Sequence, residues 1–257
     1  MNVLKRIAKY ALIAVFWVCV WVLITLALDQ PLLFPYPHTV FKRLFQLMQT
    51  KEFYEITALS LWNVMRGILI AVGLGCALSA LTARFLTVRE LLLPAMTVIK
   101  ATPVASVIIL LWLFIGSAKL PTVITVLIVL PVVWTNLDEG WARIDPQLKE
   151  MVRVYRISWY RRLFYLTLPS LKPYFVSACL TSIGLAWKAG IAAEIIVRPL
   201  GSIGLMIGDA KYYLMAEDMF AWTLVVILLS LIIESLFSFL LGRLGGERRK
   251  KEVRIND

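Results

Sequence analysis

The stretch DEGWARIDPQLKEMVRVYRISWYRRLFYLTLP, residues 138–169, decides how this chain is organised, because it is the only long polar interruption between apolar runs. After Pro146, apolar residues recur at the i, i+3, i+4 and i+7 positions that form one face of a helix. These residues are Leu148, Met151, Val152 and Tyr155, and the other face carries Lys149, Arg153 and Arg156. The pattern predicts a basic helix from Pro146 to about Ile157.

A second, shorter helix is predicted directly after the first. Ser158 can offer its side-chain oxygen to the free amides of a helix from Trp159 to about Thr167. Pro169 is expected to end this helix, because the residue before a proline avoids the helical conformation. The segment 138–172 is therefore interpreted as a basic helix-turn-helix between two apolar runs.

Composition places the rest of the chain in a membrane. Hydrophobic residues make up 60% of the 257 residues and the mean hydropathy is +0.81, which is too apolar for a soluble domain of this size. About 20 apolar residues are enough to cross a bilayer as a helix. We expect an all-α membrane protein, a single domain over 1–257, with six spans at 10–28, 59–83, 93–115, 121–137, 173–196 and 219–241.

A cleavable signal peptide is the alternative for the first apolar run, 10–28. This run is longer than the roughly 7–15 residues of a signal core, so a retained span is favoured.

Three further segments depart from straight membrane helices. Pro103 interrupts the third span. An amphipathic helix beginning at Thr39 is expected to lie along the outer membrane interface. The glycine-rich segment 198–208 predicts an irregular linker, followed by an interfacial helix at 209–218.

The positive charges indicate the orientation. The net charge is +11, and 18 of the 27 Lys and Arg residues lie in the N-terminal tail, the loop after the second span, the loop 138–172 and the C-terminal tail 242–257. Basic residues concentrate in cytoplasmic loops of membrane proteins. The pattern predicts a multi-pass protein of the cell membrane with both termini and the basic loop in the cytoplasm, and the charge needs no nucleic-acid partner to explain it.

Small residues repeat every four positions in two of the spans. Such ridges let helices approach closely in lipid, although small residues are common in any membrane helix. The second span carries Gly67, Ala71, Gly75 and Ser79, and the fifth carries Ala178, Ser182, Ala186 and Gly190. The fifth span also contains Lys188 and Glu194, whose insertion is costly. Because Lys188 and Glu194 are six residues apart, they do not lie on the same face of one helix. Each of them therefore needs its own partner, unless the span is broken near Gly190.

Several kinds of chemistry have no basis in this sequence. It contains no GxxxxGK[ST] phosphate loop, and its single histidine, His38, rules out histidine-based triads and metal clusters. The three cysteines each lie in an apolar run with no metal-like spacing: Cys19, Cys76 and Cys179. We expect no catalytic site, no metal and no cofactor in this chain. Glu234 in the last span has no assigned role.

In the segment 138–172, Glu150, Met151 and Val152 are followed at fixed distances by Leu166 and by the pair Leu168 and Pro169. With these residues at the Glu-Ala-Ala, hydrophobic and Leu-Pro positions, this helical hairpin resembles the EAA loop of binding-protein-dependent ABC importer permeases. Arg156 replaces the usual glycine, so the turn is expected not to use a glycine's freedom at positive φ. From Pro37 onward, the order of segments is similar to the branch that imports nitrate, sulfonates, taurine and thiamine precursors.

The resemblance implies a six-helix type I permease whose EAA helix couples to a separate ATPase. Glu150 would contact a basic residue of the ATPase, and Leu148, Met151 and Tyr155 would make the apolar contact. The full set implied at the coupling loop is Leu148, Lys149, Glu150, Met151, Val152, Arg153, Tyr155, Arg156, Leu168 and Pro169. An alternative for the same residues is a basic face that touches anionic headgroups.

The resemblance also implies the partners. They are two ATPase subunits, which bind ATP and Mg²⁺, a second permease copy in a homodimer, an extracytoplasmic binding protein and the lipid bilayer. Lys188, Glu194 and Arg198 are candidates for the translocation path of a small anion or vitamin precursor, or Lys188 or Arg198 instead pairs structurally with Glu194. A stand-alone secondary transporter or channel, or a membrane-embedded enzyme, are the competing functions.

Overall fold

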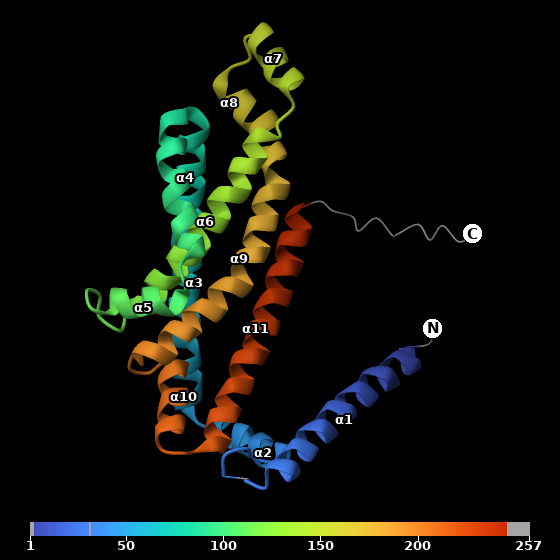
Figure 1. Cartoon of the computed structure of the whole chain (residues 1–257). Coiled ribbons are helices and arrows are strands. Elements are labelled where there is room, and N and C mark those ends of the chain that lie inside the picture. The colour runs from blue at the N-terminus through green and yellow to red at the C-terminus, as the bar shows by residue number, and fades with distance from the viewer. Residues whose placement is uncertain (1–2, 31, 246–257) are drawn as a thin grey trace.

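The computed structural model of the chain describes residues 3–30 and 32–245 (Figure 1). Within these residues the regular structure is entirely helical. The elements are α1 Val3–Leu28, α2 Pro37–Met48, α3 Lys51–Arg84, α4 Leu86–Ala101, α5 Val104–Trp112, α6 Leu120–Ala142, α7 Pro146–Val154, α8 Trp159–Arg162, the π-helix η1 Leu163–Thr167, α9 Leu168–Val197, α10 Ile203–Tyr212 and α11 Ala216–Gly245. In this described part of the chain, five helices are by length and composition able to cross a membrane, or six if the bent pair α4–α5 counts as one span.

The centre of the molecule is a bundle of α3, α6 and α9 (Figure 1). Both small-residue ridges of the sequence are buried in this bundle. A Cβ added at Gly67 of α3 would lie 2.6 Å from Thr125 Cβ of α6, and one added at Gly190 of α9 would lie 2.5 Å from Val64 Cγ2 of α3. Only glycine fits at such distances, so the small residues allow three helix backbones to approach closely.

The third predicted span is not one straight helix. It is divided into α4 and α5, whose axes differ by 101°. The break lies at Thr102 and Pro103: the proline lacks an amide hydrogen, and it pushes Thr102 into the extended region at φ −77° and ψ 131°. The sequence predicts the interruption, and in the structure α5 beyond it packs against α6 and α9.

The prediction that Pro169 ends the second hairpin helix is wrong, and the helix that contains the predicted fifth span begins well before Pro173. The helical segment runs without a gap from Trp159 to Val197 through α8, η1 and α9. In η1 the Leu168 amide donates to the Leu163 carbonyl, five residues back. Because a π turn uses five-residue hydrogen bonds, the helix tolerates the bond that Pro169 cannot donate.

The linker predicted at 198–208 is also wrong in part. The chain is helical from Ile203, and α10 occupies residues that the sequence assigned to irregular backbone. Ser202 starts this helix, because its Oγ accepts a hydrogen bond from the Leu205 amide at 3.1 Å. Together with α2, α10 lies at the end of the bundle opposite to α7 (Figure 1). The bundle therefore has an α7 end and an α10 end.

Candidate functional site

The hairpin of residues 138–172 begins with a well-defined helix start. Asp145 precedes α7, and its Oδ1 accepts a hydrogen bond from the Gln147 amide at 2.8 Å. Pro146 occupies the first helical position, where a missing amide hydrogen has no consequence. These two residues place the start of α7 at the residue that the sequence indicates.

Three apolar side chains lie exposed on one stripe, two from α7 and one from Tyr155, the residue that caps its C-terminus. Leu148 is 40% exposed, Met151 42% and Tyr155 75%, whereas Val152 is only 8% exposed. The helix itself stands clear of the bundle (Figure 1). Val152 therefore packs inside the hairpin. Leu148, Met151 and Tyr155 form an apolar surface that the described part of the chain leaves exposed.

The charged side chains of α7 are also largely free. Glu150 is exposed and makes no ion pair with any residue that the structure describes. Lys149 turns back, with its Nζ 3.3 Å from the Trp141 carbonyl oxygen, and so does not point outward like Glu150. A free carboxylate beside an exposed apolar stripe is a surface suited to a partner with a basic group and a hydrophobic groove.

The turn after α7 corrects the expectation for Arg156. Its φ is +48°, so the residue does adopt the left-handed conformation for which glycine is favoured. The Arg156 amide donates to the Arg153 carbonyl at 3.3 Å, and the Ile157 amide donates to the Val152 carbonyl at 3.1 Å. This pair of bonds is a Schellman motif, and it keeps the turn geometry even though an arginine occupies the glycine position.

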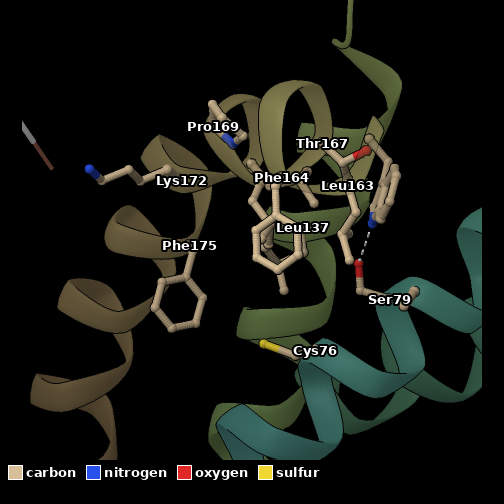
Figure 2. A pocket seen from close by; sticks show the side chains of 13 residues that line it. Cys76, Ser79, Leu137, Leu163, Phe164, Thr167, Pro169, Lys172 and Phe175 are labelled. Atoms are coloured by element: carbon tan, nitrogen blue, oxygen red, sulfur yellow. Dashed lines mark hydrogen bonds between the residues drawn. The ribbon is translucent and has the colours of Figure 1, made fainter. Parts of the chain in front are cut away.

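The second half of the hairpin differs from the expectation in its details. Ser158 precedes α8, but its side chain makes no capping hydrogen bond. Leu168 and Pro169 lie at the start of α9, on the wall of an apolar groove of about 630 Å³. Figure 2 shows this groove, with Phe164 and Phe175 on one side and Cys76 and Ser79 of α3 on the other. The Leu-Pro pair thus lines the joint between hairpin and bundle.

The structure separates the three charged residues predicted near the fifth span. Glu194 is fully buried, and its Oε2 accepts a hydrogen bond from Ser60 Oγ at 2.7 Å. Arg198 instead pairs with Asp209 of α10. Lys188 is exposed and has no carboxylate partner within 3–30 and 32–245. A structural pairing of Lys188 or Arg198 with Glu194 is therefore wrong, and α9 continues past Gly190 to Val197.

Sequence reasoning missed the partners of these charges. Ser60 is one serine in an apolar run, and nothing in its spacing connects it with a residue 134 positions later. Ser202 could have been found, since a serine directly before Ile203 is an ordinary helix start. Glu234 of α11 lies against α9, where a Cβ added at Gly184 would be 2.7 Å from its Oε1.

Comparison with known proteins identifies the family. The family described as the inner membrane component of binding-protein-dependent transport systems matches residues 67–247. The chain is 24% identical over 240 residues to the taurine transport system permease protein TauC of Escherichia coli, covering 91% of this chain and 86% of that protein.

Two further relatives are similar over shorter stretches. The chain is 31% identical to the bicarbonate transport system permease protein CmpB of Synechococcus elongatus, covering 62% of this chain and 58% of that protein. It is 28% identical to the nitrate import permease protein NrtB of Leptolyngbya laminosa, covering 77% and 71%. With the family match extending over most of the sequence, this membrane protein belongs to the inner membrane components of binding-protein-dependent transport systems, the permeases of ABC transporters.

Proposed function

We propose that this chain is the membrane-spanning subunit of an ATP-driven importer and that a separate ATPase subunit moves it through α7. The uncovered surface of α7 carries the proposal: Leu148, Met151 and Tyr155 enter a groove on the ATPase, and Glu150 pairs with a basic residue there. Headgroup binding would use the basic residues alone, and it would not require an apolar stripe.

The geometry supports a mechanical path from α7 to the bundle. The Schellman turn joins α7 to α8, and the helix then continues through η1 into α9. When two ATPases bind ATP and Mg²⁺ and close, they pull two permease copies between inward and outward openings. In this arrangement the α7 end and both termini are cytoplasmic, in keeping with the distribution of basic residues.

The translocation path lies between two copies of the chain in a homodimer. Lys188 supports this placement, because a lone ammonium on the exposed side of a membrane helix needs a water-filled surrounding. A binding protein delivers the solute at the α10 end. The solute is a small anion such as a sulfonate, nitrate or bicarbonate, for which the relatives are named, or a vitamin precursor.

The test of the proposal is Glu150→Lys. The variant should reach the membrane at the wild-type level, because Glu150 has no partner among the described residues, but it should lose most of the ATPase subunit that co-purifies with the tagged wild type. Glu90→Lys is the matched control, since Glu90 of α4 is another exposed carboxylate that forms no ion pair with a described residue. It should keep the ATPase.

If the ATPase stays bound to the Glu150→Lys variant, Glu150 is not part of the contact. If the wild-type chain binds no P-loop ATPase, the proposed function is wrong. Uptake at full rate by vesicles that hold this chain alone would instead support a stand-alone channel or secondary transporter.

A further inference from the structure

One carboxylate joins three helices at the α10 end. Glu194 lies in the last turns of α9, and it is 0% exposed. Its Oε2 accepts hydrogen bonds from Ser60 Oγ of α3 at 2.7 Å and from the Gly204 amide of α10 at 3.3 Å. A buried carboxylate in a membrane protein is costly, so its position needs a specific reason.

The same residues provide hydrogen-bond acceptors for the first backbone amides of α10. The first amides of a helix have no partner within the helix. Here the Ile203 amide donates to Ser60 Oγ at 2.9 Å, the Gly204 amide to Glu194, and the Leu205 amide to Ser202 Oγ at 3.1 Å. Two of these three acceptors come from α3 and α9. The N-terminus of α10 is therefore held by the bundle and not only by its own cap.

Two further contacts fasten α10 to α9. A Cβ added at Gly204 would overlap the backbone of Glu194 and Ile195, so the two helices touch backbone to backbone at this point. Arg198 ends α9 with a φ of +49°, and its side chain pairs with Asp209. Its guanidinium stem also lies over Gly208, where an added Cβ would be 2.9 Å from Nε. Both halves of α10 are thus attached to α9.

From this geometry we propose that Glu194 is a positioning residue that clamps α10 to α3 and α9, so that α10 moves as one rigid body with the helix that the hairpin pulls. The inference rests on the proposed function, because it assigns the α10 end its part in the movement that starts at α7. Glu194 acts as a hydrogen-bond acceptor, and its charge has no role in transport.

Two substitutions of Glu194 distinguish its function as a hydrogen-bond acceptor from the effect of its negative charge. Glu194→Ala leaves Ser60 and the Gly204 amide without their acceptor, whereas Glu194→Gln keeps a carbonyl oxygen in the same place. In the purified complex, amide exchange of the peptide covering 202–212 should become at least tenfold faster in the alanine variant and stay unchanged in the glutamine variant. Unchanged exchange in Glu194→Ala would overturn the clamp without any knowledge of the solute.

Transport is measured with the complete complex of permease, ATPase and binding protein in vesicles. The probe is labelled taurine, ethanesulfonate, nitrate or bicarbonate, whichever the wild type takes up. Glu194→Ala should take up at least tenfold less probe per ATP hydrolysed, and Glu194→Gln should stay within twofold of the wild type. Equal losses in both variants would show that the carboxylate charge is needed and would overturn the proposal.

The controls keep the two proposals apart. A wild-type complex whose ATPase does not bind or drive uptake contradicts the proposed function. A wild-type complex that works, together with a Glu194→Ala variant that works equally well, contradicts only the clamp.

Discussion

The two ends of the molecule differ in whether their polar groups are bonded within the chain. At the α10 end, Glu194 Oε2, Ser60 Oγ and the first amides of α10 bond to one another inside the bundle, and Glu194 Oε1 is the carboxylate oxygen that has no partner among the described residues. At the α7 end, Glu150 and the apolar stripe with Tyr155 are exposed and have no partner among the described residues. Groups that a chain satisfies itself hold its own structure, and groups that it leaves free serve another molecule.

The largest effect is expected from Gly204→Val at the α10 end. The added side chain meets the backbone of Glu194 and Ile195, which cannot move aside, and overpacking of this kind destabilises a protein by about 3 kcal/mol. Most of the chain should be lost from the monodisperse peak when tagged protein is analysed by fluorescence-detected size exclusion.

Gly116→Val is the matched control for this substitution. Gly116 lies in the turn between α5 and α6, and an added Cβ would have no heavy atom within 4 Å. This variant should elute like the wild type. If Gly204→Val also eluted normally, α10 would not be held against α9 as closely as the structure shows, and the contrast between the two ends would fail.

A smaller effect of a different kind is expected from Tyr155→Ala at the α7 end. Folding should not change, because an exposed side chain without partners contributes little to stability. Binding to the ATPase should weaken about thirtyfold, which corresponds to the loss of about 2 kcal/mol at an aromatic contact centre. The dissociation constant of the detergent-solubilised permease and ATPase provides the measurement.

Tyr165→Ala is the control for the aromatic surface. Tyr165 lies in η1 of the same hairpin and is 83% exposed, so its loss removes a similar amount of exposed aromatic surface outside α7. It should leave the dissociation constant unchanged. Equal weakening by both substitutions would mean that the ATPase contacts the whole hairpin and not α7 in particular.

The sequence predicts the α7 end better than the α10 end, for a physical reason. The start of α7 and its apolar stripe follow from Asp145, Pro146 and a helical period, all of which are local in the sequence. The clamp at Glu194 depends on Ser60, which is close in space and far away in the chain. A lone serine among apolar residues carries no periodic signal, so only the structure reveals its role.

The same distinction explains the wrong predictions at prolines and glycines. Pro169 was expected to stop a helix, but the outcome depends on whether the preceding turn can widen into a π-helix, and η1 does so. In 198–208, glycines suggested irregular backbone, yet Gly204 and Gly208 lie inside α10, where close contact with α9 requires them. In a membrane protein, small residues also serve close packing between helices, so they do not by themselves indicate a loop.

The smallest effect concerns the end of α7, where Arg156 adopts a φ of +48°. A left-handed conformation costs a residue with a Cβ about 1 kcal/mol more than it costs glycine. Because α7 stands clear of the bundle, it opens locally, and amide exchange of the peptide covering 146–157 is the suitable measurement. Arg156→Gly should slow this exchange about fivefold, since 1 kcal/mol corresponds to a factor of about five.

Arg153→Gly removes the same charge from a helical position in the last turn of α7, and it serves as the opposite control. A glycine inside a helix is about 1 kcal/mol less favourable than a good helix former, so exchange should become about fivefold faster. Two glycines three residues apart therefore should have opposite effects on one helix. If both substitutions accelerated exchange, the free hairpin would not form the Schellman turn. The ATPase would then be needed for α7 to adopt its helical conformation, and not only to bury its apolar surface.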